Sequence, residues 1–368
     1  MSTQIVTINL VVYNGEKYIR QCLDAVLAQS YPHELIEINI LDNNSTDKTK
    51  EIIKSGQWTV DSGQLPKFSL FEQSENLGTW PGQEELLKHG HGKYVVALSV
   101  DVILHPDFIK NAIEAMERDS RIGALQAKVY KYDLMRLPVI NYQLPITIID
   151  TLGFQIFRSR RLINIGHGET DHGKYDQNVS CYARASQDTA KICYKQIFAV
   201  EGAVPVFRRQ ALEDCRLESQ NNKIIDHDYF WYGDDLDLAW RMKLFGWKQV
   251  YTPSVIAWHD RKTTKALAGG WYEFIKIRKT VPMFKRRLDW RNTTLTIIKN
   301  DFATNLLRDL PYILWRQLRL WTYFLFFEPS MFLEIFNVAK LLPCMLKRRK
   351  EIMQKTKILP REFHQWIH

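Results

Sequence analysis

The sequence predicts an α/β protein with a mostly parallel central sheet flanked by helices, followed by an α-helical C-terminal region. Three observations carry this prediction. Nearly continuous apolar, β-branched runs alternate with segments of helical spacing from the first residues onward. A polar loop follows each run, and the composition becomes basic and aromatic after Trp258. We therefore expect two regions, residues 1–260 and 261–368.

Charge is divided unevenly between these regions. The chain has 368 residues, of which 45% are hydrophobic and 25% charged, so it is globular and large enough for a sizeable core. Residues 1–259 carry 28 Lys and Arg against 32 Asp and Glu, whereas residues 260–368 carry 22 against 9. A basic block of this kind fits an anionic membrane surface, nucleic acid or a solvated helical face.

The cysteines and the first residues bear on location. Five widely spaced cysteines form no C-x-x-C pair, which indicates reduced thiols in a cytosolic protein and no structural zinc. The apolar segment at residues 5–12 follows the start directly, without a basic n-region or a cleavage site. We therefore expect no secretory leader and a cytoplasmic protein.

The first strand is predicted at Gln4–Tyr13, and it ends in Tyr13-Asn14-Gly15-Glu16. Residues 17–29 have helical spacing, and a second strand at Ile36–Leu41 leads into the polar run Asp42–Asp47. Loops after parallel strands meet at one edge, so both should face one crevice. The alternative for the second loop is a turn with a helix N-cap.

A further strand at Lys93–Asp101 ends in a carboxylate on the same side of the sheet. It follows a short strand at Phe68–Phe71 and a loop at Glu75–Gly82. A divalent cation that bridges Asp101 and a substrate diphosphate would explain this position. The alternative is a carboxylate that caps a helix over residues 106–118.

A cluster of three carboxylates opens the helix predicted at Tyr232–Arg241. Acids stabilise the first turn of a helix, so an ordinary capped amphipathic helix is one interpretation. Asp234 and Asp235 are adjacent and repel each other, which favours a catalytic carboxylate. Asp226-His227-Asp228, just upstream, is interpreted as scaffolding for this segment and not as a metal site.

Five segments, in this order and spacing, resemble family 2 glycosyltransferases of the GT-A fold. They are Val11–Glu16, Leu41–Asp47, Asn76–Gly78, Leu98–Asp101 with Pro106-Asp107, and Gly233–Asp237. The resemblance covers residues 5–260. The stretch Arg160–Asp176, with residues 201–203 and 208–209, is most similar to the rhamnosyltransferase-like branch.

The resemblance implies a nucleotide-sugar site at the strand ends. Asp42 would bond the pyrimidine, and the remaining positions would surround the base, the ribose and the sugar. These positions are Tyr13, Asn14, Glu16, Asn44, Ser45, Asn76, Gly78, Ser99 and Val100.

The resemblance also implies a metal, Mn²⁺ or Mg²⁺. Asp101 matches the last residue of the family's D-x-D, but Ser99 replaces the first aspartate, so the cation has one fewer charged ligand. His259 matches a position where many members supply a histidine. Neutral imidazole suits Mn²⁺ better than Mg²⁺. The alternative for His259 is a packed or outer-sphere histidine.

Asp235 matches the family's general base, and Asp234 stands where glutamate is usual. The base would deprotonate an acceptor hydroxyl as the sugar–phosphate bond breaks, with inversion at the anomeric carbon. The resemblance implies transfer of L-rhamnose from dTDP-rhamnose to a lipid-linked or cell-surface glycan. The alternatives are a UDP-hexose donor, or a nucleotide-sugar-binding homologue without turnover, which Ser99 favours.

The C-terminal region alternates apolar runs such as Leu320–Phe327 and Met331–Phe336 with charged residues. No run approaches the ~20 residues of a spanning helix, so we expect none to cross a bilayer. Aromatic helices beside the basic run Lys347–Lys350 favour attachment to the inner face of the cell membrane, with no nucleic-acid partner. The alternative is a homo-oligomer or a packed helical core, since prolines should divide these helices.

Overall fold

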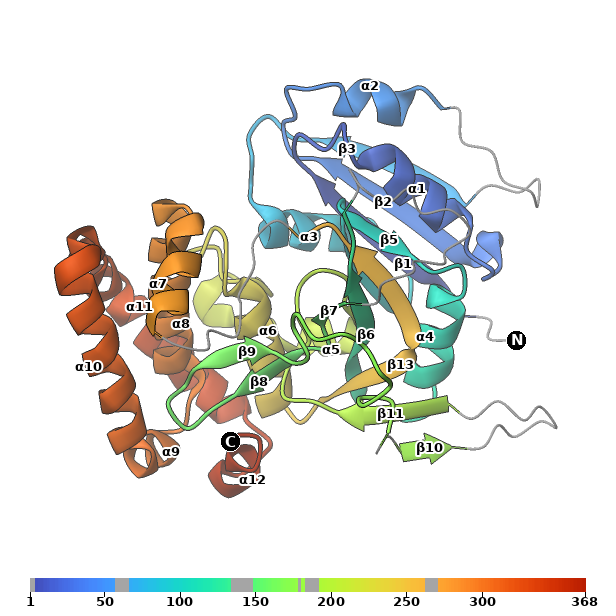
Figure 1. The fold of residues 1–368 in the computed structure, drawn as a ribbon. Coiled ribbons are helices and arrows are strands. Elements are labelled where there is room, and N and C mark those ends of the chain that lie inside the picture. Colours follow the sequence, from blue (N-terminus) through green and yellow to red (C-terminus); the bar gives the residue numbers. More distant parts are fainter. Residues whose placement is uncertain (1–3, 57–65, 134–147, 178–179, 183–191, 262–270) are drawn as a thin grey trace.

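A twisted central sheet carries most of the first 260 residues (Figure 1). The computed structural model describes residues 4–56, 66–133, 148–177, 180–182, 192–261 and 271–368. The strand order is β10-β11-β13-β6-β12-β4-β1-β2-β3, with β5 on β13 and β7 on β6. The strands are β1 Val6–Val12, β2 Ile36–Asp42, β3 Lys67–Glu72, β4 Tyr94–Ser99, β5 Val102–Leu104, β6 Ile122–Lys131, β7 Ile149–Thr151, β8 Phe154–Ile156, β9 Leu162–Asn164, β10 Ser180–Tyr182, β11 Ile192–Gln196, β12 Val206–Arg208 and β13 Lys248–His259.

The sheet is mixed but mostly parallel, which confirms the predicted fold class. Strands β3, β2, β1 and β4 are parallel neighbours, and β13 lies parallel to β6, while β12 enters antiparallel between β4 and β6. In the register, Val12 lies opposite Asp42 and Val11 lies opposite Ser99. The carboxyl ends of three parallel strands are therefore level, and the loops that follow them start from one edge.

Helices cover both faces of the sheet. The buried side chains of α1, α2 and α4 belong to one apolar core, and those of α3, α5 and α6 belong to the core on the other face. Alternate residues of each strand supply the two cores, because side chains alternate between the faces of a strand. The bounds are α1 Ile19–Leu27, α2 Thr49–Lys54, α3 Thr79–Leu87, α4 Phe108–Met116, α5 Arg209–Asp214 and α6 Asp234–Leu244.

The C-terminal helices form a bundle beside α6, and the end of the chain returns to the sheet domain (Figure 1). Phe363 and Ile367 are buried in the core that also holds α6. Buried Arg160 is ion-paired with Asp301 and, at 2.7 Å, with Asp309. The helices are α7 Trp271–Thr280, α8 Met283–Asn300, α9 Ala303–Arg308, α10 Leu310–Phe327, α11 Leu333–Lys355 and α12 Pro360–His364.

Two of these helices are longer than predicted. Pro311 lies in the first turn of α10, where a missing N–H costs nothing, and Pro343 is accommodated inside α11. Within the described residues, Pro329–Lys355 is long and apolar enough to cross a membrane by length and composition, a test that buried core helices also meet. The expectation that no segment reaches this length is therefore wrong.

The cysteine prediction also needs a correction. Cys22, Cys215 and Cys344 are free thiols, whereas Cys193 on β11 forms a disulfide and lies opposite Cys181 of β10 in the ladder. The antiparallel pairing of β10 with β11 places these positions side by side, which their spacing in the sequence did not indicate. The expectation that every cysteine is reduced is wrong for Cys193.

Candidate active site at the strand ends

The loops after β1 and β2 are joined by hydrogen bonds. The backbone N–H of Asn14 donates to Ser45 Oγ at 3.0 Å, and that of Thr46 donates to Asn14 Oδ1 at 2.8 Å. Glu16 Oε2 accepts the N–H of Lys48 at 3.0 Å, at the start of α2. Asn14 and Asn44 adopt left-handed backbone conformations, with φ of 50° and 68°, which asparagine tolerates better than most residues. The structure thus brings both predicted donor loops to one edge.

Asp42 is fully buried between these loops. Its Oδ2 accepts the N–H of Ser45 at 3.1 Å and lies 3.6 Å from Lys50 Nζ. Its Oδ1 is also buried, and within the described part of the chain it has no hydrogen-bond partner. A buried carboxylate oxygen without a donor carries a free-energy cost, so a ligand N–H at this point would be stabilising.

Asn43 brings the third loop to the same edge, and sequence reasoning missed this role. Its Nδ2 donates to Asn76 Oδ1 at 2.8 Å and to the Gly78 carbonyl at 3.1 Å, while its Oδ1 accepts the N–H of Leu77 at 2.9 Å. Asn43 is buried, whereas Asn76 and Tyr13 are exposed at the surface. The available signal was its position in the polar run that follows the end of β2.

The end of β4 places Asp101 against His259. Asp101 Oδ2 lies 3.4 Å from His259 Nε2, and the Asp101 carbonyl accepts the N–H of Asp260 at 3.0 Å. Val100 packs under the donor loop, since a Cβ on Gly15 would lie 3.2 Å from its Cγ2. Asp101 therefore contacts the end of β13. The alternative that Asp101 caps the following helix is wrong, because the N-cap residue of α4 is Asp107.

His259 is oriented by a second carboxylate. Its Nδ1 lies 2.9 Å from Asp150 Oδ2, which also accepts from Arg261 Nε at 2.9 Å. Arg261 in turn donates to Glu201 Oε1 at 2.6 Å. Asp150 and Arg261 were not predicted, because they come from separate segments outside the quoted motifs. Glu201 lies in a segment that carries the resemblance, but it was not predicted as a site residue.

The charges in this network are mutually dependent. Burial opposes ionisation of Asp101, yet the hydrogen bond and charge of His259 lower the pKa of its carboxyl. Burial also lowers the pKa of His259, but Asp101 and Asp150 outweigh it and raise that pKa to about 9. Without a cation, His259 is therefore protonated at neutral pH.

The donor set fits a divalent cation in part. Asp101 offers an oxygen and His259 a ring nitrogen, and Asp150 fixes the ring from its other nitrogen, as an outer-sphere carboxylate does for a metal-bound histidine. Across the described residues, no group of three His, Cys, Asp or Glu side chains could enclose an ion. Two protein ligands suit a cation completed by substrate phosphates and water.

The second carboxylate site lies at the start of α6. Gly233 turns the chain with φ of 83°, and the half-buried Asp235 accepts the N–H of Gly202 at Oδ2, 3.2 Å away. Asp234 is 3% exposed, and burial, followed by the charge of Asp235, raises its pKa to about 8. The repulsion expected between the two acids is relieved because Asp234 is neutral at pH 7.

The third acid of the cluster is structural. Asp237 is fully buried between Arg241 and Lys299, each 2.9 Å from a carboxylate oxygen. Its pKa is lowered because the charges of these two cations overcome the effect of burial. Asp237 faces the C-terminal helices and has no access to the strand edge.

The segment Glu201–Ala203 joins the two carboxylate sites. The N–H of Gly202 contacts Asp235, the carbonyl of Ala203 accepts the N–H of Ser99 at 3.0 Å, and Glu201 binds Arg261. Asp235 is therefore one short backbone segment away from the β4 end that carries Asp101. The two acids expected to act together approach the same edge from different elements.

The comparisons with known proteins concern the family and the fold. Residues 7–172 match the family described as Glycosyl transferase family 2. This part of the chain is therefore similar to family 2 glycosyltransferases. A dolichyl N-acetyl-alpha-D-glucosaminyl phosphate 3-beta-D-2,3-diacetamido-2,3-dideoxy-beta-D-glucuronosyltransferase of Methanococcus voltae is 26% identical over 149 residues, 39% of the chain. The chain's match spans only 45% of that relative's length.

Solved glycosyltransferase structures share the fold. GalNAc-T7, solved with UDP, GalNAc and Mn²⁺, superposes with a TM-score of 0.55 at 11% identity, covering 80% of this chain and 48% of its own. A Pyrobaculum calidifontis mannosyltransferase, solved with GDP-Man and Mn²⁺, gives 0.50 at 16% identity, covering 100% and 84%. These similarities establish the GT-A fold of the glycosyltransferase. Neither structure nor the Methanococcus relative is named as a rhamnosyltransferase.

Proposed function

We propose that the chain transfers a sugar from a nucleoside diphosphate donor to a hydroxyl group of a glycan, with inversion at the anomeric carbon. The observation that carries this proposal is the Glu201–Ala203 segment, which joins Asp235 to the strand end bearing Asp101. In-line displacement needs a base on one side of the sugar and stabilisation of the leaving diphosphate on the other.

The donor base binds at Asp42. Its unpartnered Oδ1 accepts a ring N–H, which uracil, thymine and guanine present and adenine lacks. Asn44 and Ser45, with Asn76 and Gly78 opposite, surround the base and ribose. The sequence resemblance favours a pyrimidine and, within it, dTDP-rhamnose, with a UDP-hexose as the alternative donor.

Further donor contacts come from Tyr13, Asn14 and Glu16 on one side and from Ser99 and Val100 on the other. Tyr13 is 49% exposed, so its ring is available to cover a bound nucleotide. Glu16 has a competing structural role, since its carboxylate caps α2.

Asp101 and His259 would hold the divalent cation, Mn²⁺ or Mg²⁺, and the cation would supply positive charge beside the diphosphate of the donor. His259 must lose its proton to bind metal, and Asp150 keeps its ring oriented as it does so. The single carboxylate makes the site depend on the donor phosphates for affinity.

Asp235 is the general base. It takes the proton of the acceptor hydroxyl, and the Gly202 N–H holds its Oδ2 in place. Asp234 stays protonated beside it below a pH of about 8, so it adds no charge that would draw the proton away. The two neighbouring carboxyl groups thus have different roles.

The acceptor is lipid-linked or lies at the cell surface, and the C-terminal helices bind an anionic membrane from the cytoplasmic side. α10 lies on the side of the helical bundle away from the sheet (Figure 1). It exposes aromatic side chains, with Trp315 at 63% and Phe326 at 72%. Large apolar side chains in the interface and nearby lysines favour such attachment. The exposed apolar residues of α10 and α11 are Leu310, Tyr312, Leu314, Trp315, Leu318, Leu325, Phe326, Phe327, Leu333, Ile335, Phe336 and Leu346.

Flotation of the full chain with vesicles of anionic or neutral lipid tests the attachment. We expect co-flotation with anionic vesicles and loss of it in a W315E/F326E variant. A variant that floats as well as the parent would contradict the membrane proposal. A dimer by light scattering that W315E/F326E abolishes, without vesicle binding, would instead assign this face to a homo-oligomer.

Donor binding is tested by thermal shift with UDP, dTDP, GDP and ADP, each with and without Mn²⁺, followed by transfer assays with the matching sugars. A ligand that binds only the native state raises the melting temperature. We expect UDP or dTDP to give the largest shift, Mn²⁺ to increase it, and Asp101→Asn to remove the Mn²⁺ increment. Equal shifts with all four nucleotides would contradict the proposed donor site.

A further inference from the structure

The turn that leads into α6 is strained. Phe230 and Tyr232 have φ of 63° and 66°, and Gly233 has φ of 83°. Left-handed backbone is rare for bulky aromatic residues and is energetically unfavourable for them. Such a conformation persists only where surrounding contacts fix it. Because Asp235 follows within three residues, whatever fixes this turn also sets the direction of the base.

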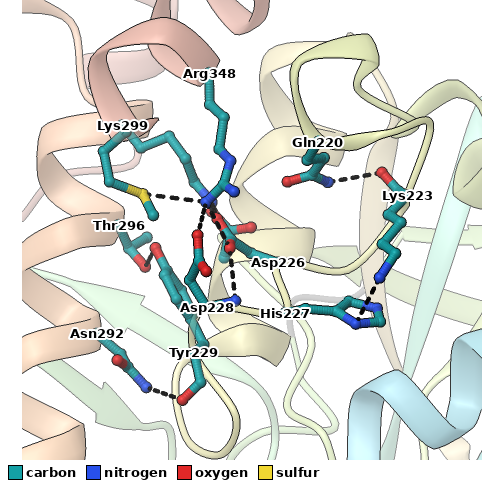
Figure 2. A network of polar contacts seen from close by, with 12 residues as sticks. Gln220, Lys223, Asp226, His227, Asp228, Tyr229, Asn292, Thr296, Lys299 and Arg348 are labelled. Atoms are coloured by element: carbon teal, nitrogen blue, oxygen red, sulfur yellow. Dashed lines mark hydrogen bonds and ion pairs between the residues drawn. The ribbon is translucent and has the colours of Figure 1, made fainter. Parts of the chain in front are cut away.

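Asn292 of α8 hydrogen-bonds directly to the backbone of this turn. Its Nδ2 lies 3.1 Å from the carbonyl oxygen of Tyr229, 2.9 Å from that of Trp231 and 2.6 Å from that of Tyr232, so its two N–H groups are shared among three acceptors. Figure 2 shows Asn292 pointing from α8 toward Tyr229. Asn292 is fully buried. It also packs closely against the turn, since a Cβ added to Gly233 would lie 3.2 Å from the Cβ of Asn292.

The upstream part of the turn is anchored separately. Arg348 of α11 pairs with Asp226 at 2.8 Å and with Asp228 at 2.7 Å (Figure 2). Tyr229 Oη lies 2.9 Å from Thr296 Oγ1. These contacts hold residues 226–229, whereas Asn292 contacts the carbonyls of residues 231 and 232, next to the helix start.

The same turn also borders the donor loops. A Cβ on Gly78 would lie 2.5 Å from the carbonyl oxygen of Phe230, so the turn lies directly against the loop that Asn43 draws in. The strained residues therefore span the distance between the donor edge and the base.

From these contacts we infer that Asn292 is a positioning residue for Asp235, supplied by the C-terminal region to a site otherwise built by the sheet domain. The inference rests on the proposed function, because it takes Asp235 as the base. Asn292 acts on the backbone of residues 229–232 and touches no substrate. Its loss lets the strained turn relax and moves the base relative to the acceptor hydroxyl.

The test is Asn292→Asp in the full chain, compared with Asn305→Asp. Asn305 is a matched control because it is also buried, lies on α9, and donates its Nδ2 to a backbone carbonyl, that of Pro360, at 2.9 Å. The Asn292 change replaces the donor with oxygens that repel three carbonyls. We expect kcat for transfer to fall about 10-fold to 100-fold, since small misplacements of reacting groups have effects of this size.

The expected pattern separates positioning from folding. The KM for donor should stay within about twofold of the parent, and donor hydrolysis should fall less than transfer, because water can approach a displaced base more freely than a glycan hydroxyl. Asn305→Asp should keep the parent's kcat. If Asn292→Asp does not fold, Asn292→Ser, which keeps one donor, replaces it.

Two results would overturn the inference. The first is a kcat of Asn292→Asp equal to that of the parent. The second is that Asn292→Asp and Asn305→Asp lose equal amounts of thermal stability and also equal amounts of kcat. Failure of the proposed function would look different. In that case the parent itself would transfer no sugar, or Asp235→Asn would match it.

Discussion

The donor side and the base side of the site are held by different parts of the chain. The loops after β1, β2 and β3 hydrogen-bond to one another through Asn14, Asn43 and Ser45, all within the first 80 residues. The turn before α6 is held by side chains of α8 and α11, at least 60 residues further along the chain. Donor binding is thus a local property of the sheet edge, whereas placement of the base depends on the C-terminal helices.

Breaking a buried ionic contact between the two regions tests this contrast most strongly. Lys299 of α8 is buried between Asp226 and Asp237, so Lys299→Met leaves both acids with less compensation. Asp226 keeps Arg348 and Asp237 keeps Arg241, so we expect a loss of about 3 kcal/mol in the free energy of unfolding, the lower end for a broken buried pair. Urea denaturation measures it.

Lys54→Met is the matched control, since Lys54 pairs with Glu72 at 2.6 Å on the exposed donor side. An exposed pair contributes about 1 kcal/mol or less. Donor affinity should survive in folded Lys299→Met, because the donor loops do not use that lysine. Equal destabilisation by the two changes, or loss of donor binding in Lys299→Met, would contradict the division.

Asp42→Asn should act on the donor side and leave the base side unchanged. In Asp42→Asn, an NH₂ group replaces one of the two carboxylate oxygens. The side chain can then no longer accept hydrogen bonds at both positions, the Oδ2 position used by the protein and the unpartnered Oδ1 position proposed for the ring N–H. We expect nucleotide affinity by calorimetry to fall about 10-fold to 100-fold, the effect of about 1.5–3 kcal/mol for a hydrogen bond to a charged group. Glu72→Gln, opposite Asp42 on β3 but exposed, should bind as the parent does. Parent-like binding by Asp42→Asn would remove Asp42 from the donor site.

The pH dependence of stability sharpens the description of the base side. Asp234 binds a proton up to a pH of about 8 in the native state, whereas an unfolded aspartate releases it near its ordinary pKa of 3.8. Between these values the unfolded state binds fewer protons, so stability falls as pH rises and levels off above pH 8.

Asp234→Asn does not titrate, so the stability of the parent relative to Asp234→Asn should decline from pH 5 to pH 8 by at most about 1.4 kcal/mol per unit. Urea unfolding of both proteins at each pH measures the difference, in which the contributions of other groups cancel. Parallel curves would show that Asp234 is ionised throughout and that two charges stand side by side at α6.

The strands and the carboxylates at their ends could be predicted because both signals are local. Segments rich in β-branched residues, such as Ile36–Leu41, identify buried strands, and Asp42 and Asp101 lie at or after strand ends. Asp235 lies in the first turn of a helix, after a glycine. The last strand, β13, runs over Lys248–His259, with a register shift between Thr252 and Ile256 before it pairs with β5.

The supporting residues could not be predicted in the same way. Asp150, Arg261 and Asn292 reach the site from segments that only tertiary packing brings together, and each is an ordinary residue in its own sequence context. Pro343 led to a wrong prediction, since it was expected to divide a helix. Instead, α11 continues through it and tolerates the lost hydrogen bond.

The most direct test of the central claim is sugar transfer by Asp235→Asn, measured together with donor affinity on the same preparation. Removing a general base should lower the transfer rate about 100-fold to 10,000-fold, while the dissociation constant for the nucleotide stays within about twofold of the parent. That result would separate the base from the donor loops. A transfer rate equal to the parent's, with donor bound normally, would contradict the account.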